Sequence, residues 1–524
     1  MPKVLVTDQI AQDGIDLLSA EAEVNVHLRP SPDELLKLIK GHEAIVVRSE
    51  TKVTADVIAA ADVLQVIGRA GSGVDNIDLD AATKRGIVVV NAPTGNTLSA
   101  AEHAIALMLA MARQLPAAFT SLRSGSWERQ KFIGVELRGK TLGLLGLGQV
   151  GMEVARRTRG MEMRVIAHDP YVAQERAQSL GVELLSRDEV LGEADFISLH
   201  MRATAQTINI IDDEQIAKMK PGARIINTAR GELIDDAALL RGLDSGQLAG
   251  AAIDVFREEP PGENPLLSHS KVIVTPHLGA LTEEAQERAA TDVCEQVLAV
   301  LRGEPARYAV NAPLVSEETM EVLRPFFQVA ERIASIATQI SDGQIRAVEI
   351  EYLGEIANHD TTPLKAAVIK GLLAPVSSEN VTVVNANLIA EERGLRITER
   401  SGPSEEYTNL LTIKLETDAG VTTVAGSVFN EAAHIERVND FWVDVPLDSD
   451  YLLICQNQDR PGMVGAVGAF LGEQDINISF MRLGREKVRG NALMVMGLDD
   501  EISPELLRKL ESVPGLHAAR LAKL

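Results

Sequence analysis

The chain has 524 residues, enough for roughly three to five domains of about 100–200 residues each. Its 45% hydrophobic and 24% charged residues are typical of a globular protein and exclude a fibrous or disordered class. With 51 Lys and Arg against 75 Asp and Glu, the net charge is −24, and only 3% of residues are aromatic. Nucleic acids and anionic membranes are therefore poor partners, and a small anionic substrate would need a local group of arginines.

The beginning of the chain, Met1 to Asp8, reads as a strand and lacks the apolar run of a signal peptide. The longest apolar run, Ala104–Ala112, is too short to span a bilayer. The two cysteines, Cys294 and Cys455, form no CxxC pair, which argues against a zinc site or a disulfide framework. The sequence therefore predicts a cytoplasmic protein without a metal site.

The first stretch alternates short apolar strands with helices, the pattern of a mostly parallel sheet with right-handed crossovers. Strands are predicted at Val4–Thr7, Glu23–Leu28, Ala44–Val47, Val66–Gly68 and Val88–Val90. Helices are predicted near Ala11–Ser19, Pro32–Ile39, Ala55–Ala61 and Leu79–Arg85, followed by a long helix from Thr97 to Arg113.

A second α/β unit begins at Lys140. Its strands are predicted at Leu142–Leu145, Arg164–Ala167, Phe196–Leu199, Arg224–Asn227, Ala251–Asp254 and Val272–Thr275. A helix over Glu283–Arg302 then returns toward the first unit, which makes that unit discontinuous in sequence. The segment Arg302–Pro313 reads as a linker.

The last part of the chain has a different character. Met320–Ile340 is predicted as one amphipathic helix, and half-buried strands are predicted at Val381–Asn385, Leu411–Glu416 and Thr422–Val428. Residues 446–450 mark a second linker. Residues 451–524 read strand–helix–strand–strand–helix–strand.

A glycine motif, GLGQVG, follows a predicted strand and opens a helical pattern. Its glycines, Gly146, Gly148 and Gly151, allow a tight turn and place a pyrophosphate at the N-terminus of the helix. Asp169 ends the next strand, where a carboxylate accepts hydrogen bonds from the ribose hydroxyls and repels the 2′-phosphate of NADP. The motif predicts NAD as cofactor, with an ordinary turn between a strand and a helix as the alternative.

Three later motifs each follow a predicted strand, where open α/β sheets bind ligands. NTARG contains Arg230, whose planar fork suits the carboxylate of a 2-hydroxy acid. TPHLGA contains His277, whose side chain moves a proton near neutral pH. DVFREEP contains Glu258 and Glu259. Taken singly, Arg230 reads as an ion-pair partner and the two glutamates as solvated loop charges.

In this order the motifs GLGQVG, HDP, NTARG, DVFREEP and TPHLGA resemble the D-2-hydroxyacid dehydrogenase family, over Lys3 to about Pro313. The resemblance implies that Arg230 binds the substrate carboxylate and carbonyl, that His277 is the acid/base and that Glu259 is its partner. It also implies a dinucleotide site made by the three glycines and by Ser72, Gln149, Val150, Asp169, Thr228, Asp254 and Gly279.

One departure from the family lies after His200. Where the family usually has a proline two residues on, this chain has Met201-Arg202, which leaves that cofactor contact open.

Within the family the greatest likeness is to the long-form D-3-phosphoglycerate dehydrogenases, carried by the motifs VRS, GRAGSGVDN and SWER. The likeness implies a phosphorylated substrate bound by Arg48, Arg69, Ser72, Gly73 and Arg129, with Arg129 reaching across a dimer. The implied reaction is the NAD-dependent oxidation of 3-phospho-D-glycerate to 3-phosphohydroxypyruvate, the first step of phosphorylated L-serine biosynthesis. Taken alone, each of these arginines could equally well have a structural role, such as forming an ion pair.

The tail motif QNQDRPG resembles an ACT domain, a small ligand-sensing ferredoxin-like fold. The likeness places Asn457, Asp459 and Asn477 where such domains hold L-serine, although related tails often carry an aromatic or imidazole side chain in place of Asn457. ACT domains commonly pair through edge strands, so a homo-oligomer, as a tetramer, is also implied. Whether the C-terminal modules sense a ligand or serve only assembly stays open.

The resemblance predicts a substrate-binding domain at residues 1–96 and 284–312 and an NAD-binding Rossmann domain at 97–283, both doubly wound parallel sheets. It predicts an α+β intervening domain, similar to an allosteric substrate-binding domain, at 313–446 and the ACT domain at 450–524. Two other functions remain open: a dehydrogenase of another acid, such as glyoxylate or 2-oxoglutarate, and an NADH-sensing corepressor. The arginines favour the phosphorylated substrate, and the tail disfavours the corepressor.

Overall fold

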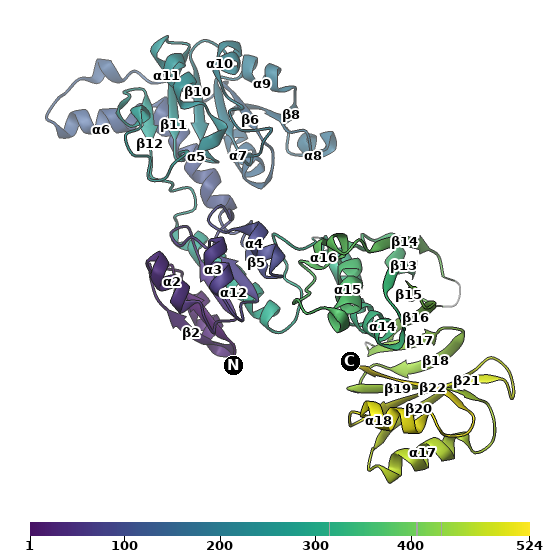
Figure 1. Ribbon diagram of the computed structural model, residues 1–524. Coiled ribbons are helices and arrows are strands. Elements are labelled where there is room, and N and C mark those ends of the chain that lie inside the picture. Colours follow the sequence, from purple (N-terminus) through teal and green to yellow (C-terminus); the bar gives the residue numbers. More distant parts are fainter. Residues whose placement is uncertain (314, 405–406, 431) are drawn as a thin grey trace.

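The computed structural model describes residues 1–313, 315–404, 407–430 and 432–524. These residues form four sheets that follow one another along the chain (Figure 1). The first two sheets are parallel, the third is mixed and the fourth is antiparallel. The predicted fold class is confirmed.

The first sheet has the order β2-β1-β3-β4-β5. Its strands are β1 (Lys3–Val6), β2 (Glu23–Val26), β3 (Ala44–Val47), β4 (Val66–Arg69) and β5 (Val88–Asn91). The connecting helices are α1 (Gln12–Glu21), α2 (Pro32–Leu38), α3 (Ala55–Ala60) and α4 (Leu79–Lys84). A later helix, α12 (Glu283–Leu301), returns to lie against α1 and β4. Gly68 permits this contact, since a Cβ there would lie 2.7 Å from Val293 and Val297.

The second sheet has the order β12-β11-β10-β9-β6-β7-β8. Its strands are β6 (Thr141–Leu145), β7 (Arg164–His168), β8 (Glu183–Leu184), β9 (Phe196–Leu199), β10 (Ala223–Asn227), β11 (Leu248–Ile253) and β12 (Val272–Val274). The chain runs outward from β6 in one direction and then restarts at β9 in the other. The strand order therefore switches between β6 and β9, where open α/β sheets form a ligand crevice.

The helices of this unit are α5 (Thr97–Ala112), α6 (Leu115–Arg123), α7 (Gln149–Arg159), α8 (Gln174–Ser179), α9 (Arg187–Glu193), α10 (Asp213–Lys218) and α11 (Asp236–Asp244). Short 3₁₀ helices lie at η1 (Arg129–Phe132), η2 (Gly231–Leu233) and η3 (Pro265–Ser268). Figure 1 shows α6 projecting away from the rest of the unit.

The third sheet has the order β14-β13-β15-β16-β17-β18. Its strands are β13 (Ile345–Gly354), β14 (Arg396–Gly402), β15 (Asn409–Thr417), β16 (Val421–Phe429), β17 (Ala432–Val438) and β18 (Phe441–Pro446). The accompanying helices are α13 (Glu317–Leu323), α14 (Phe326–Ile340), η4 (Glu355–Asn358), α15 (Thr362–Leu373), η5 (Ala374–Val376) and α16 (Ala386–Glu392).

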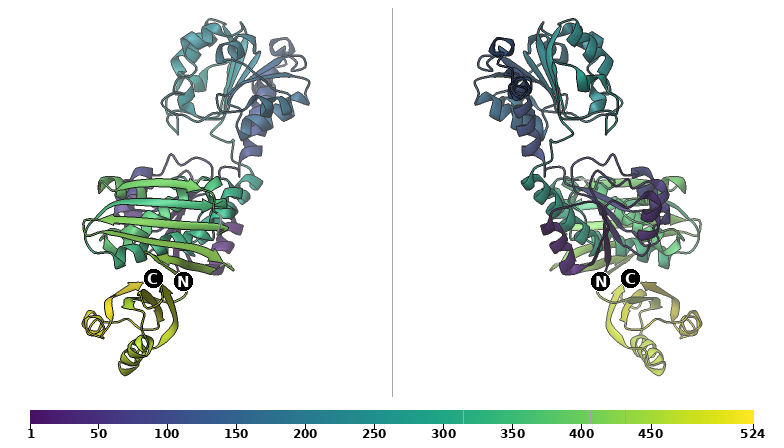
Figure 2. Two further views of the ribbon diagram at one scale, coloured as in Figure 1. Left: turned by 90° about the vertical axis from the view of Figure 1, so that its right-hand side faces the viewer. Right: turned by 90° about the vertical axis from the view of Figure 1, so that its left-hand side faces the viewer.

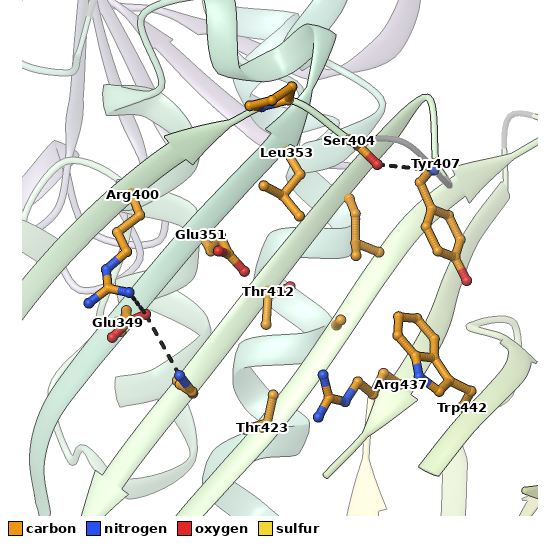
Figure 3. Close-up of a pocket in the computed structure, with 14 residues that line it drawn as sticks. Glu349, Glu351, Leu353, Arg400, Ser404, Tyr407, Thr412, Thr423, Arg437 and Trp442 are labelled. Carbon is orange, nitrogen blue, oxygen red and sulfur yellow. Dashed lines mark hydrogen bonds and ion pairs between the residues drawn. The ribbon is translucent and has the colours of Figure 1, made fainter. Parts of the chain in front are cut away.

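One face of the third sheet packs against α14, which also packs on α15. The opposite face carries a pocket of about 380 Å³ with mixed charges (Figure 3). Glu349 pairs there with Arg400 and Lys414, and the Tyr407 ring stacks on Trp442 at 5.9 Å.

Two predictions in this part of the chain are wrong. The single helix predicted over Met320–Ile340 is two helices, α13 and α14, because Pro325 lacks an N–H and cannot continue a helix. The strand predicted at Val381–Asn385 is a turn before α16. The Asn385 side chain closes this turn by accepting from the Thr382 N–H at 2.7 Å and donating to the Asn380 carbonyl at 2.9 Å.

The fourth sheet has the order β20-β21-β19-β22. It consists of β19 (Tyr451–Gln458), β20 (Ile478–Arg485), β21 (Asn491–Leu498) and β22 (Leu516–Lys523), with α17 (Met463–Glu473) and α18 (Pro504–Leu510). The predicted order of elements is confirmed. One face buries Leu452, Ile454 and Val495 in the core cluster of the third sheet, so the last two units share a core. Figure 2 shows these two units next to each other.

No single helix of the described residues is long and apolar enough to cross a membrane. Taken together, α5 and α6 reach that length and hydropathy, but they are bent by 62°. Across the described part of the chain, no group of three His, Cys, Asp or Glu side chains is arranged to hold a metal ion.

Candidate active site

Three neighbouring parallel strands bring polar side chains to one edge of the second sheet. Asn227 of β10 pairs with Ile253 of β11, which pairs with Val274 of β12, so the carboxyl ends of the three strands lie side by side. Arg230 follows β10 and Glu259 follows β11. His277 follows β12. The structure therefore gathers the three predicted catalytic residues at the same edge.

His277 and Glu259 form a direct pair. Nδ1 of His277 lies 2.7 Å from Oε2 of Glu259, and the Phe256 N–H donates to Oε1 at 3.1 Å. Burial alone would raise the pKa of Glu259, but the hydrogen bonds from His277 and Phe256 outweigh it and lower that pKa below its ordinary value. The bond orients the ring, and the tautomer that donates from Nδ1 to this carboxylate has Nε2 as its acceptor.

The turn that carries His277 is organised by Asp254. This carboxylate is fully buried and accepts hydrogen bonds from Thr275 Oγ1 at 2.6 Å and from the amides of Leu278 at 2.8 Å and Gly279 at 2.9 Å. Asp254 and Gly279 were predicted as cofactor residues, and the structure places them together behind the catalytic turn.

Arginines from two sheets meet beside the catalytic edge. Arg69, at the end of β4, is largely buried and lies within the electrostatic reach of Arg230 and Arg48. Burial first, and then the charge of Arg230, lower the pKa of Arg69 to about 10. Nη2 of Arg230 lies 3.5 Å from the exposed carboxylate of Asp75. Within the described residues, buried Nε of Arg69 has no hydrogen-bond partner, as expected of a donor reserved for a ligand.

Gly73 and Ser72 line the approach to these arginines. A Cβ on Gly73 would lie 2.5 Å from Nη2 of Arg230, so any side chain there would displace the guanidinium. The Ser72 carbonyl accepts from Asn91 at 2.6 Å, and its hydroxyl is 3.3 Å from Nδ2 of Asn96.

Two polar side chains, not identified from the sequence, hold the loop that carries Arg48. Asp8, at the end of β1, accepts from the amides of Arg48 at 2.6 Å and Thr51 at 3.1 Å. Nδ2 of Asn76 donates to the Arg48 carbonyl at 2.7 Å and the Thr51 carbonyl at 2.6 Å. The side chain of Arg48 donates to Gln286 of α12 at 3.1 Å.

The glycine loop after β6 fits a pyrophosphate. A Cβ on Gly146 would lie 2.5 Å from the His200 carbonyl, and one on Gly151 would lie 2.4 Å from the Gly146 carbonyl, so both positions need glycine. The space in front of Gly148 is open, and this N-cap residue of α7 has no side chain that could cap the helix. The free N–H groups of that helix suit an anion.

Other predicted cofactor residues surround this loop. Asp169 accepts from the amides of Leu147 at 2.8 Å and Tyr171 at 2.9 Å, which fixes its carboxylate at the end of β7. Gln149 accepts from Thr97 at 3.2 Å, and Val150 packs into the core beneath α7. The Thr228 hydroxyl is buried and has no partner among the described residues. Together these groups fit a dinucleotide.

The departure at Met201-Arg202 lies next to the same loop. His200 is half-buried, and its Nε2 lies 2.9 Å from Oγ of Ser198. Burial lowers the pKa of His200 to about 4. Arg202 itself is exposed, and its carbonyl accepts from Thr207 at 2.7 Å.

The structure does not bring Arg129 to the other arginines. It is exposed and lies on η1, which contacts the projecting helix α6. The surrounding arm exposes five large apolar side chains, with Trp127 76% exposed: Leu115, Phe119, Leu122, Trp127 and Ile133.

The predicted effector residues are also apart within one chain. Asn457 is 3% exposed, and its Oδ1 is buried without a partner in the described residues. Asp459 is 3.3 Å from Arg485. Asn477 donates to Asp499 at 2.7 Å and precedes the end of β20 that pairs with Leu498, whereas Asn457 pairs with Ala492 at the other end of β21.

Comparison with known proteins agrees with this geometry. Family models match residues 105–279 (D-isomer specific 2-hydroxyacid dehydrogenase, NAD binding domain), 322–438 (D-3-phosphoglycerate dehydrogenase intervening domain) and 451–515 (ACT domain). The D-3-phosphoglycerate dehydrogenase of Synechocystis sp. is 45% identical over 527 residues, covering 100% of this chain and 95% of that protein. The one from Methanocaldococcus jannaschii is 44% identical over 517 residues and covers 98% of both chains. The chain belongs to the D-3-phosphoglycerate dehydrogenase family.

A solved structure of a protein from Thermus thermophilus is 36% identical, with a TM-score of 0.55. It covers 59% of this chain and 99% of that chain. As a member of the D-3-phosphoglycerate dehydrogenase family, the chain is an NAD-dependent oxidoreductase. NAD is the cofactor of its second α/β unit.

Proposed function

We propose that the chain oxidises 3-phospho-D-glycerate to 3-phosphohydroxypyruvate with NAD, the first step of phosphorylated L-serine biosynthesis. The observation that carries this proposal is the group of Arg48, Arg69 and Arg230, of which Arg69 is largely buried, beside the His277–Glu259 pair. An acid/base pair alone would suit any 2-hydroxy acid. Three cationic side chains from two sheets suit a substrate that carries a phosphate as well as a carboxylate.

His277 removes the hydroxyl proton. Because Nδ1 is bonded to Glu259 at 2.7 Å, the lone pair of Nε2 accepts that proton, and the ionised glutamate stabilises the imidazolium that results. Bound NAD would accept the hydride from the carbon that carries the hydroxyl. Loss of the proton and the hydride converts the alcohol into a carbonyl.

Arg230 holds the other end of the reacting group. Its guanidinium binds the substrate carboxylate and, in the direction of reduction, stabilises the negative charge that develops on the carbonyl oxygen. In the free protein the guanidinium lies 3.5 Å from exposed Asp75, which the substrate carboxylate would replace. Arg48 and Arg69 take the phosphate, Ser72 and Gly73 lie beside them, and Arg129 of a second copy would complete the site.

The test is a set of initial rates of NADH formation with 3-phospho-D-glycerate, D-glycerate, 2-hydroxyglutarate and glycolate. A kcat/KM for the phosphorylated acid at least tenfold above the others supports the proposal. A higher value for an unphosphorylated acid would assign the chain to another 2-hydroxy acid, and binding of NADH without turnover of any acid would favour a sensing role.

We also propose that the chain forms a homo-oligomer, as a tetramer. The apolar side chains of the α6 arm have nothing to cover them in the described part of one chain, and a second copy would bury them. The same contact would bring Arg129 to a neighbouring site. Sedimentation of wild type and Phe119→Glu at equal concentrations tests it, with a smaller assembly expected for the variant.

L-Serine is the proposed effector of the fourth unit. Asp459 would bind the ammonium and Asn477 both ends of the amino acid. Their positions toward opposite ends of the sheet support a site completed by two copies. The proposed domains are 1–96 with 284–312, 97–283, 313–446 and 450–524, supported by the return of α12 to the first sheet.

A further inference from the structure

A second histidine–carboxylate pair lies behind the catalytic one. His103, on α5, places Nε2 at 3.1 Å from Oδ1 of Asp254 and at 3.3 Å from Oγ1 of Thr275. The His103 side chain is 18% exposed and that of Asp254 is fully buried. Neither the motifs nor the proposed mechanism gives His103 a role.

The neighbouring turn has a conformation that it would not adopt unaided. His277 has a φ of 54°, in the left-handed region that residues with a Cβ rarely enter. Three successive amides of this turn point at Asp254: the His277 N–H donates to its carbonyl at 2.8 Å, and those of Leu278 and Gly279 donate to its carboxylate. Asp254 is thus the template on which the catalytic turn is formed.

Asp254 itself must be held by something outside the turn. A fully buried carboxylate needs hydrogen-bond donors. Among the described donors to its carboxylate, Thr275, Leu278 and Gly279 belong to the turn itself, and His103 is the one that comes from another element. Burial would raise the pKa of Asp254, but the hydrogen bonds led by those from His103 and Thr275 lower it, so the carboxylate remains ionised.

The helix that carries His103 is firmly placed. Seven of its side chains, among them Ala101, Leu107 and Met108, belong to the core cluster that includes Leu142 and Leu144 of β6. Thr97, at its start, donates to Gln149 of the glycine loop at 3.2 Å. A hydrogen bond from this helix therefore fixes Asp254 relative to the centre of the sheet and to the cofactor loop at once.

We propose that His103 is a positioning residue, which holds Asp254 and through it the left-handed turn that aims His277 at the substrate. The proposal rests on the proposed function only in taking His277 as the acid/base. His103 touches neither substrate nor reacting atoms; it limits how far the catalytic ring can move. A displacement of a catalytic group by about 1 Å lowers turnover by roughly 100-fold, so a looser turn should lower kcat by about 10- to 100-fold.

The experiment compares His103→Phe, which removes the donor and keeps the volume, with His103→Gln, which keeps an N–H donor. Glu102→Gln, an exposed position on the same helix, is the matched control. Amide hydrogen exchange of residues 275–280 is measured by mass spectrometry without ligands. The value of kcat and the KM values for NAD and for 3-phospho-D-glycerate are measured separately. We expect His103→Phe to exchange at least about tenfold faster in this segment and to lose kcat with KM values within about threefold of wild type. His103→Gln should restore most of the slow amide exchange and most of kcat.

The proposal is overturned if His103→Phe exchanges and turns over like wild type. It is equally overturned if the Phe and Gln variants are impaired alike, since the donor would then not be what matters. Should His103→Phe fail to fold, His103→Leu takes its place in the same comparison. The exchange measurement uses no substrate, so a chain that preferred another hydroxy acid would refute the proposed function and leave this result intact.

Discussion

Replacing Arg69 with methionine should stabilise the unliganded protein and weaken binding of the phosphorylated substrate. Arg69 is largely buried near two other cations, and its Nε lacks a partner in the described residues. A neutral side chain of similar length removes the buried charge while keeping much of the packing of the stem. The two effects have opposite signs because the charge serves the ligand and not the fold.

The magnitude follows from the pKa of Arg69, which falls from 12.5 to about 10 in the folded protein. At about 1.36 kcal/mol per pKa unit, this difference corresponds to roughly 3 kcal/mol. Because the folded value lies below the unfolded one, the native state disfavours the charged form at every pH below about 10, and the penalty is relieved only as the pH rises through that value. The variant also loses attraction to Asp75, so we expect a net gain of about 1–3 kcal/mol.

The assays are thermal unfolding without ligand and initial rates with 3-phospho-D-glycerate and D-glycerate. At roughly 2–4 °C per kcal/mol, the Tm of the first unit should rise by several degrees. KM should rise at least about tenfold for the phosphorylated acid and much less for D-glycerate. Arg29→Met, which removes an exposed ion pair with Glu50, is the control and should change neither the Tm nor the KM values. A lower Tm in Arg69→Met, or equal KM changes for both acids, would refute the reasoning.

Three further variants test the site. Glu259→Gln should keep NADH binding and lose kcat. Because folding lowers the pKa of Glu259 from 4.5, the ionised carboxylate stabilises the protein above about pH 4.5, and this stabilisation is lost as the pH falls further. If the Tm of the variant depended on acid pH in the same way as that of wild type, this reasoning would be contradicted. Asp169→Ala should weaken NAD binding and raise the relative rate with NADP, measured as the ratio of the two kcat/KM values; equal use of both cofactors by wild type would show that Asp169 does not discriminate. Asn477→Ala should abolish serine binding in calorimetry, and undiminished binding would move the effector site elsewhere.

The catalytic edge could be predicted because a parallel sheet aligns the carboxyl ends of its strands. Polar motifs after β10, β11 and β12 had to meet once those strands were recognised, whatever lay between them in sequence. The choice of Glu259 over Glu258 came from the family resemblance, since both follow the same strand. The 2.7 Å contact of Glu259 with His277 gives the physical reason for that choice.

The supporting residues could not be predicted in the same way. Asp8 follows a strand like many turn residues, and only the folded loop shows that its carboxylate collects the amides of Arg48 and Thr51. His103 left one weak signal: it is a polar residue among the mostly buried apolar positions of α5. A histidine at such a position needs a hydrogen-bond partner, but the sequence does not show which strand end lies opposite the helix and supplies that partner.

The two wrong predictions lie in the third unit. Both were based on the spacing of apolar residues, and in both cases a single local residue determines a different structure. The helical pattern from Met320 to Ile340 continues through Pro325, and the proline decides the outcome because it removes the N–H that the helix needs there. The alternation at Val381–Asn385 resembles a strand, but side-chain hydrogen bonds of Asn385 compete successfully with strand pairing.

The arginine group explains how a strongly acidic chain can bind an anionic substrate. A chain of net charge −24 repels a phosphorylated acid at long range, so binding must depend on charges within a few ångströms of the ligand. Burial strengthens those charges, because the low local dielectric that lowers the pKa of Arg69 also magnifies its attraction for an anion. The same burial destabilises the unliganded fold, and a bound phosphate would relieve that destabilisation. Substrate affinity and the instability of the free site therefore have a single physical origin, which is why a variant that improves one should impair the other.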